Sequence, residues 1–177
     1  MNSRERVIAS LDFHATDRVP LDLGGMRSTG ISGFAYAGLR AALGLPKRLP
    51  RMYDTGQMLA LPERDVLDAL GCDVVHVTLD AHTNAFDEPD RWHRYDFNGR
   101  LPALVERPER FHTLEGGTLA QRDGDWVATM PPASHVFDSE HAGEPLDLEA
   151  EIVEPDWESK QRELERRAFS EERVAAI

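Results

Sequence analysis

Hydrophobic positions in the first half of the chain alternate between helical and extended spacing. Apolar residues recur at helical spacing in residues 2–11, 32–43 and 62–71, and residues typical of helix ends bound each segment. Residues 19–23 instead alternate in an extended pattern, and residues 72–79 are almost continuously apolar. Alternation predicts a half-buried strand, and a continuous apolar run is typical of a strand in a parallel sheet. Strand, helices and strand in this order predict an α/β fold with a crossover connection.

The pattern then changes to short extended segments joined by tight turns. Asn98-Gly99 and Asp123-Gly124 each separate two extended segments, and both dipeptides favour the tight turn of a β-hairpin because they tolerate positive φ angles. We therefore expect an antiparallel β-hairpin insertion, followed by an acidic loop and a last helix that begins at Trp157. The chain divides into a first α/β part at residues 1–91, the insertion at residues 92–137, and the loop and C-terminal helix at residues 138–177.

Composition and charge exclude several classes of protein. The 177 residues are 41% hydrophobic and 29% charged, which is typical of a folded globular chain. Lys and Arg number 20 against 32 Asp and Glu, a net charge of -12, whereas a nucleic-acid partner requires a basic surface. No apolar run approaches the ~20 residues that span a bilayer, and residues 1–11 have no signal-peptide core. With a single cysteine, Cys72, no internal disulfide can form, and we expect no membrane partner and a cytoplasmic location.

Short motifs are spread in order along nearly the whole chain. They are Arg4-Glu-Arg-Val7, Asp17-Arg-Val-Pro20, Asp22-Leu-Gly-Gly25, Arg27-Ser-Thr-Gly-Ile31, Ala35-Tyr36, Leu43-Gly-Leu45, Tyr53-Asp54 with Gln57 and Leu59-Ala60, Leu70-Gly-Cys-Asp-Val-Val75, Met130-Pro131, Phe137-Asp138 and Pro145-Leu146. In this order they resemble the N-terminal part of the uroporphyrinogen decarboxylase (URO-D) superfamily. The resemblance implies the N-terminal part of a TIM (β/α)8 barrel with an antiparallel β-hairpin insertion. The barrel would be incomplete in this chain, because such barrels typically need about 250 residues.

The superfamily implies two activities. True uroporphyrinogen decarboxylases remove acetate carboxyls from a tetrapyrrole without a cofactor, whereas their relatives move a methyl group between a corrinoid protein and a thiol or other acceptor, usually with zinc. The decarboxylases carry Met-Arg-Gln-Ala-Gly-Arg after the first strand, and both arginines bind substrate carboxylates. This chain has Gly-Gly-Met-Arg-Ser-Thr-Gly at that place, with Arg27 alone. A substrate with many carboxylates requires clustered guanidinium groups, so the resemblance favours the corrinoid-associated, methyltransferase-like branch.

Arg27 and Asp80 are the catalytic residues that the resemblance implies. Asp80 follows Asp73 at the spacing of an essential aspartate in the decarboxylases, which places it at the C-terminal end of a strand, where barrel active sites lie. Arg27 lies beside a glycine turn whose backbone N–H groups are candidates to bind an anion. Together these residues would orient an anionic or tetrapyrrole-type ligand. The implied substrate-binding residues are Gly24, Gly25, Ser28, Tyr53 and Gln57.

Each candidate also has a purely structural explanation. The arginine would be a surface residue on a tight turn, and turn geometry alone would explain the glycines. Residues 51–53 predict a brief extended segment, after which Asp54 or Thr55 would cap a helix that starts near Gln57. His76 lies on the second predicted strand without another histidine at metal-binding spacing. We expect it to be a core or pocket residue, and we expect no metal ligands in this chain.

Three interpretations of the function stay open. The favoured one is part of a corrinoid-dependent methyltransferase-type enzyme that binds a tetrapyrrole or corrinoid-linked small molecule, with a corrinoid protein as partner. The first alternative is a true uroporphyrinogen decarboxylase of porphyrin biosynthesis. The second is a catalytically inert, truncated or split half that acts only by pairing through its unpaired strand edges, either as a homodimer or with the missing C-terminal half. The family's zinc ligands, a His-x-Cys pair and a distant Cys, belong to that second half, so zinc and a corrinoid are expected only in the complete enzyme.

Overall fold

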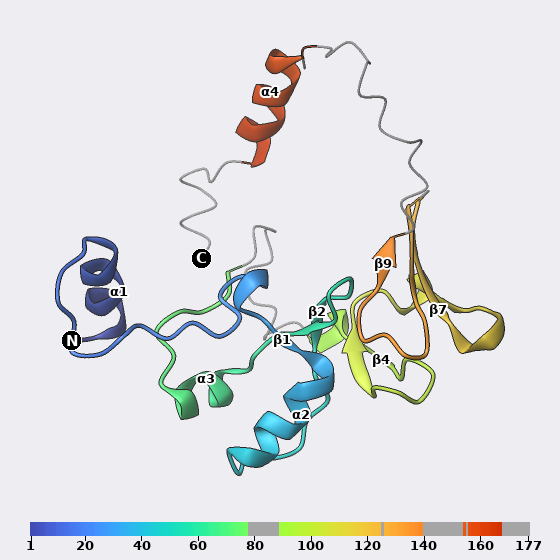
Figure 1. Cartoon of the computed structure of the whole chain (residues 1–177), viewed down its shortest axis with the longest axis horizontal. Helices are drawn as coiled ribbons and strands as arrows, with labels where there is room; N and C mark the ends of the chain where they lie inside the picture. The colour runs from blue at the N-terminus through green and yellow to red at the C-terminus, as the bar shows by residue number, and fades with distance from the viewer. Residues whose placement is uncertain (78–88, 125, 140–153, 155, 168–177) are drawn as a thin grey trace. The chain divides into compact units, whose positions relative to one another are not determined.

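The computed structural model describes residues 1–77, 89–124, 126–139, 154 and 156–167 (Figure 1). The chain forms two compact units. The first unit comprises Met1–His76 and Phe86–Glu140, and the second comprises Val77–Ala85 and His141–Ile177. The predicted site residues that the structure describes all belong to the first unit.

The first helix, α1 (Ser3–Leu11), begins where its capping residues predict. Asn2 Oδ1 accepts the Glu5 backbone N–H at 2.9 Å, and the Glu5 carboxylate accepts the Asn2 N–H at 3.0 Å, which completes a capping box. Arg6 projects from this helix and is nevertheless buried, because its guanidinium donates to two carboxylates, one of which belongs to Asp73. These bonds fix α1 to the segments that follow it.

Residues 19–23 and 72–76 lie side by side, but neither segment is a strand in the structure. Leu21 donates its N–H to the Asp73 carboxylate at 2.9 Å and accepts the Asp73 N–H at 2.8 Å. Because a side chain takes the Leu21 amide, no ladder of backbone bonds forms, and the two predicted strands are wrong for these residues. Residues 78–79, the end of the second predicted strand, lie outside the described residues. The barrel to which the resemblance assigns both segments stays a prediction.

Helix α2 (Gly33–Ala42) has both ends that the sequence predicts, and helix α3 (Arg64–Leu70) has the predicted end but begins two residues later than predicted. The Ser32 hydroxyl accepts the Phe34 N–H at 3.3 Å and caps α2. Gly71, at φ +67°, ends α3 in the left-handed conformation that glycine adopts without strain. Local residues therefore define the start of α2 and the end of α3.

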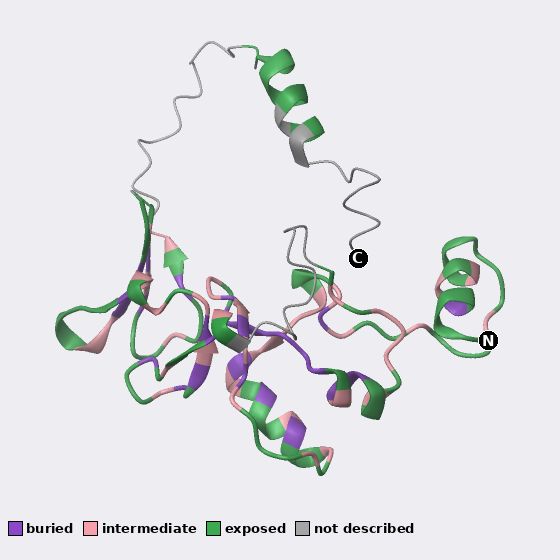
Figure 2. Cartoon of the chain, turned by 180° about the vertical axis from the view of Figure 1, so that it is seen from behind, coloured by how far each residue is buried: buried purple, intermediate pink, exposed green. Residues whose placement is uncertain are grey.

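A buried charge network connects α2 with the start of α3. Buried and exposed residues alternate along α2, where Tyr36 and Arg40 are buried (Figure 2). Arg40 is 1% exposed and donates to Glu63 at 2.6 Å and to Asp65 at 2.9 Å. The Tyr36 hydroxyl donates to the same Glu63 oxygen at 2.7 Å. The charge of the buried arginine is thus paired with two carboxylates.

Three short strands form an antiparallel sheet in the order β1-β3-β2. They are β1 (Ile31–Ser32), β2 (Met52–Asp54) and β3 (Leu59–Ala60). The extended segment predicted at residues 51–53 is confirmed by β2. The helix predicted to start near Gln57 is wrong, because Asp54 Oδ1 accepts the Gln57 N–H at 2.9 Å and closes a turn instead. Met58, at φ +55°, then leads the chain into β3.

Both predicted hairpins of the insertion are confirmed. Its strands are β4 (His93–Tyr95), β5 (Ala103–Val105), β6 (Phe111–Thr113), β7 (Leu119–Asp123), β8 (Trp126–Met130) and β9 (Asp138–Ser139). β4 pairs antiparallel with β5, and Asn98 and Gly99 between them have φ angles of 58° and 73°. β7 pairs antiparallel with β8, and Gly124 lies in the turn between them at φ 60°. Asp123, predicted as a turn residue, is instead the last residue of β7 and pairs with Trp126. β6 and β9 extend this hairpin to a four-stranded sheet in the order β6-β7-β8-β9.

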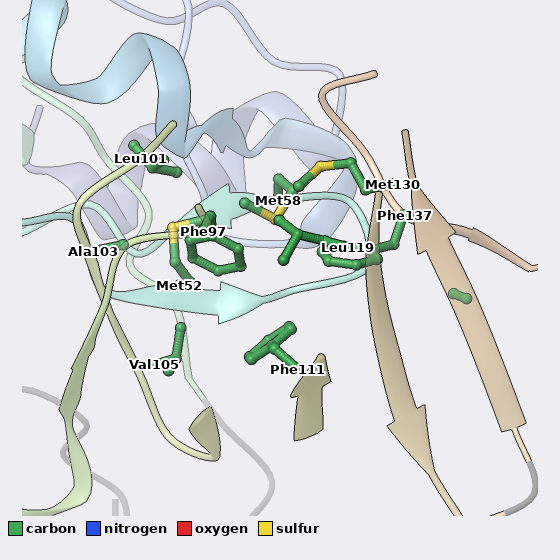
Figure 3. Close-up of a cluster of buried hydrophobic side chains, with 11 residues drawn as sticks. Met52, Met58, Phe97, Leu101, Ala103, Val105, Phe111, Leu119, Met130 and Phe137 are labelled. Carbon is green, nitrogen blue, oxygen red and sulfur yellow. The ribbon is translucent and has the colours of Figure 1, made fainter. Parts of the chain in front are cut away.

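The main hydrophobic core joins the insertion to β2 and the turn after it (Figure 3). The Phe97 and Phe111 rings of the insertion meet edge to face at 5.2 Å. The insertion therefore packs on the first part of the chain within one compact unit. The buried members of this core are Met52, Met58, Phe97, Leu101, Ala103, Val105, Phe111, Leu119, Ala128, Met130 and Phe137. Short 3₁₀ helices connect the elements: η1 (Arg27–Thr29), η2 (Pro89–Arg91), η3 (Pro108–Arg110) and η4 (Glu115–Gly117).

The second unit contains helix α4 (Trp157–Arg167). Asp156 Oδ1 accepts the Ser159 N–H at 3.1 Å, so the helix begins at the predicted residue, and the continuation predicted beyond it lies outside the described residues. Trp157 and Leu164 of this helix are 64% and 67% exposed. Among the described helices, none has the length and apolar character needed to cross a membrane.

Candidate functional site

The predicted glycine turn lies directly before β1 and is closed by its own hydrogen bonds. Gly24, at φ +77°, donates its N–H to the Thr29 carbonyl at 2.8 Å, and Gly25 donates to Asp22 Oδ1 at 2.8 Å. A Cβ at Gly24 would lie 2.7 Å from the Pro62 ring, so both backbone conformation and packing require glycine there. Because both amides bond within the turn, neither N–H is left to cradle an anion. The structure supports the turn-shaping explanation of these glycines.

Arg27 lies on η1 and pairs with Asp54 of β2. Arg27 Nε is 2.8 Å from Asp54 Oδ2, and the other carboxylate oxygen accepts the Gln57 N–H. The Arg27 side chain is 69% exposed, whereas the Asp54 side chain is 9% exposed. Asp54 thus brings together Arg27 and Gln57, two predicted site residues that lie far apart in the sequence. Ser28, also on η1, is exposed beside them.

Tyr53 and His76 form the buried polar part of this region. Their rings are 4.8 Å apart and tilted by 55°. Tyr53 Oη and His76 Nδ1 are both buried, and neither has a hydrogen-bond partner among the described residues. A Cβ at Gly30 would lie 3.2 Å from Tyr53 Oη, so a glycine gives this hydroxyl its room on the side of the turn. Buried polar atoms are nearly always bonded, and an unpaired one costs about 1–3 kcal/mol.

The surroundings of Tyr53 keep its hydroxyl protonated. Burial raises the Tyr53 pKa above its ordinary value, and the nearby Asp54 and Asp22 carboxylates act in the same direction. Arg27 opposes them and lowers the pKa, but it does not reverse the shift. At neutral pH the phenol is therefore a neutral donor. The arrangement thus holds one hydroxyl donor and one imidazole nitrogen, both buried without a partner among the described residues, near the paired Arg27.

Asp73 anchors the segment that carries His76. Its side chain is fully buried and accepts bonds from the Leu21 amide, Arg18 and Arg6, which hold its pKa well below the ordinary range. Asp80, the catalytic residue predicted from its spacing to Asp73, lies outside the described residues.

Cys72, beside this anchor, is a half-buried free cysteine. Burial raises the pKa of its thiol, so the neutral thiol is the dominant form at neutral pH. A reactive thiolate is therefore not part of this arrangement.

Sequence reasoning missed two partners in this site. The sequence spacing between Arg27 and Asp54 does not predict their ion pair, because the ion pair depends on β2 lying next to η1. His76 was expected as a core or pocket residue, and its unpartnered nitrogen was not foreseen. The only indication was one histidine within an apolar segment. In the part of the chain that is described, no three or more His, Cys, Asp or Glu residues gather as a metal site.

The chain was also compared with known proteins. No family model, no curated protein and no solved structure matched it. The resemblance to the URO-D superfamily accordingly stays a prediction. The interpretation of the site depends on the contacts described above.

Proposed function

We propose that this chain is part of an enzyme of the URO-D superfamily, in its corrinoid-dependent, methyltransferase-like branch. Tyr53, His76 and Arg27 hold the polar end of a tetrapyrrole-type or corrinoid-linked small molecule. The order of short motifs along the chain supports the family, and the site residues chosen from those motifs supply Arg27, Tyr53 and Gln57 to one region.

The observation that carries the proposal is the pair of buried, unpartnered atoms Tyr53 Oη and His76 Nδ1. Burying a polar atom without a bond opposes folding, and such atoms are typical of functional sites. A ligand that bonds to both atoms recovers this free energy on binding, which favours a polar ligand over an apolar one. Tyr53 donates from its neutral hydroxyl, while His76 Nδ1 donates or accepts according to its tautomer.

The state of Arg27 favours the methyltransferase-like branch over true decarboxylases. Its charge is balanced by Asp54 at 2.8 Å, so it is a poor single anchor for a substrate with many carboxylates. The second arginine of the decarboxylase motif is missing from the sequence at that place. The site is suited to a ligand whose buried end is polar and uncharged.

Zinc, which the family's methyltransferases use, does not fit the residues that the structure describes. Across these residues there is no cluster of three or more metal-binding side chains, so no step is assigned to zinc here. In this proposal the corrinoid belongs to a partner protein and carries the methyl group. The residues of this chain bind and orient the ligand.

Binding to the two classes of ligand separates the branches. Equilibrium dialysis of the purified chain against methylcobalamin and against uroporphyrinogen is expected to give saturable binding of methylcobalamin. Tyr53→Phe and His76→Phe are expected to weaken that binding about five- to thirty-fold each, because each removes one hydrogen bond in a buried site. Tyr95→Phe, a matched loss of a phenol hydroxyl on β4, is expected to change nothing. Preferential binding or decarboxylation of uroporphyrinogen, or no binding of either compound, would contradict the proposal.

A second candidate function is assembly with another polypeptide. Val19, Leu21 and Val75 are 76%, 45% and 51% exposed on the two adjacent segments that the sequence predicted as a half-buried strand and a strand of a parallel sheet. Exposed apolar side chains on two neighbouring segments favour an interface. Gel filtration at rising protein concentration tests this candidate. A chain that stays monomeric and still binds methylcobalamin would rule it out as the main function.

A further inference from the structure

A polar cavity of about 80 Å³ lies where the end of β2 meets the insertion. Tyr53 of β2 and Thr55 of the turn after it line the cavity on one side, and Glu106, Arg107 and Arg110 line it from the insertion. The buried Phe111 contributes to its lining from the main core. Its volume is several times the roughly 10–15 Å³ that one water requires, so a group of several heavy atoms has room.

Two guanidinium groups at this cavity share one carboxylate. Arg110 Nη2 lies 2.6 Å from Asp123 Oδ2, and Arg107 Nη1 lies 3.6 Å from Asp123 Oδ1. Arg107 also contacts Glu109 at 3.1 Å, but the Glu109 side chain is 65% exposed. Glu106 is paired separately with an arginine outside the cavity at 2.8 Å. Ion pairs with exposed carboxylates are weak, so a ligand anion can replace Asp123 and Glu109 as the partner of the two arginines at little cost.

The neutral side of the cavity also has unused hydrogen-bonding capacity. Gln121, 3% exposed, donates from Nε2 to Thr55 Oγ1 at 2.8 Å, and its Oε1 has no partner among the described residues. In this orientation Thr55 accepts a bond and keeps its own proton to donate. With the amide turned over, Thr55 would donate to Oε1 and the amide N–H groups would be unused. Either way the Thr55–Gln121 pair retains a donor.

We propose that this cavity binds an oxyanion group, the phosphate or carboxylate of a small ligand, through Arg107, Arg110 and Thr55. Guanidinium groups provide planar, charge-assisted donors that match such groups, and a hydroxyl adds a third direction. Asp123 competes with the ligand, because its carboxylate pairs with the Arg110 guanidinium in the absence of a bound anion. The site is formed by both the first part of the chain and the insertion. Tyr53 lines it as well, but the anion-binding residues Arg107, Arg110 and Thr55 have no part in the function proposed above, so each proposal can fail without the other.

Isothermal titration calorimetry of the whole chain tests this site, with inorganic phosphate in one arm and acetate in the other. At least one of the two anions is expected to bind, and the stronger one identifies the group. Arg110→Gln is expected to weaken binding about ten-fold or more, because a charged hydrogen bond is lost. Asp123→Asn is expected to strengthen binding about two- to five-fold, because the competing charge is removed.

The exposed ion pair Arg64–Asp68 on α3, with Nε and Oδ1 2.8 Å apart, provides the matched controls. Arg64→Gln and Asp68→Asn are expected to leave anion affinity unchanged. If Arg110→Gln unfolds, Asp123→Asn and Thr55→Val decide the outcome, and Thr55→Val is expected to weaken binding a few-fold. The proposal is overturned if neither anion binds, if the control variants change affinity as much as the site variants, or if Asp123→Asn weakens binding.

Discussion

Arg27 Nε lies 2.8 Å from Asp54 Oδ2, although the arginine is largely exposed and the carboxylate is buried. The same carboxylate accepts the Gln57 N–H at 2.9 Å and closes the turn after β2. The two bonds of Asp54 therefore do different things: one holds an exposed cation at the site, and the other shapes the backbone beneath it.

Substitutions at Asp54 are expected to separate these two roles. Arg27→Gln and Asp54→Asn each remove the ion pair but keep an acceptor for Gln57, so each is expected to lower the free energy of unfolding by about 1 kcal/mol or less. Asp54→Ala also removes the acceptor and is expected to lower it by about 1–3 kcal/mol. Urea denaturation measures all three variants. An Asp54→Ala variant no less stable than Asp54→Asn would contradict this division of roles.

The glycine turn gives a second prediction. Gly24→Ala is expected to destabilise the fold by about 1–3 kcal/mol, because the new Cβ would meet the Pro62 ring at a positive φ angle. Gly38 is the control, since a Cβ there meets nothing within 4 Å and the residue lies inside α2. Gly38→Ala is expected to stabilise by about 0.5–1 kcal/mol. Thermal unfolding of both variants tests this, and equal effects would refute the packing argument.

The buried Asp73 carboxylate predicts an acid-sensitive step in stability. Its pKa is lower in the folded chain than in the unfolded chain, because the Leu21 amide and two arginines bond to the charged form. The unfolded chain therefore binds the proton more tightly, and the stabilisation is fully present above about pH 4 and lost as pH falls below it. Melting temperatures measured between neutral pH and pH 3 are expected to fall steeply at the acid end. Asp73→Asn is expected to flatten that fall and to lower stability at neutral pH, whereas the exposed Asp68→Asn is expected to leave the curve unchanged.

The parts of the fold that local chemistry determines were predictable. Asn98, Gly99 and Gly124 adopt positive φ angles at the two hairpin turns, and Asn2 with Glu5 specifies the first helix start. The predicted strands at residues 19–23 and 72–76 failed because a strand needs partners elsewhere in the chain. Here the Leu21 amide bonds to the Asp73 side chain, and the local sequence pattern does not predict a contact between residues so far apart in the chain.

The site was predictable to a similar extent. The motif order selected Arg27, Tyr53 and Gln57, and the structure brings Arg27 and Gln57 to one carboxylate. The carboxylate, Asp54, was predicted to cap a helix that starts near Gln57. In the structure the chain turns at Gln57 and continues as β3. The unpartnered nitrogen of His76 follows from three-dimensional packing against Tyr53, which sequence spacing does not encode.

The central claim is that the buried Tyr53 hydroxyl serves a ligand and not the fold. Tyr53 Oη has no partner among the described residues, so its removal takes no hydrogen bond from that part of the chain. Tyr53→Phe, measured for melting temperature and for methylcobalamin affinity in the same preparation, tests this most directly. We predict an unchanged or higher melting temperature together with binding weaker by about five-fold or more. A lower melting temperature with unchanged affinity would contradict the claim, since the hydroxyl would then stabilise the fold alone.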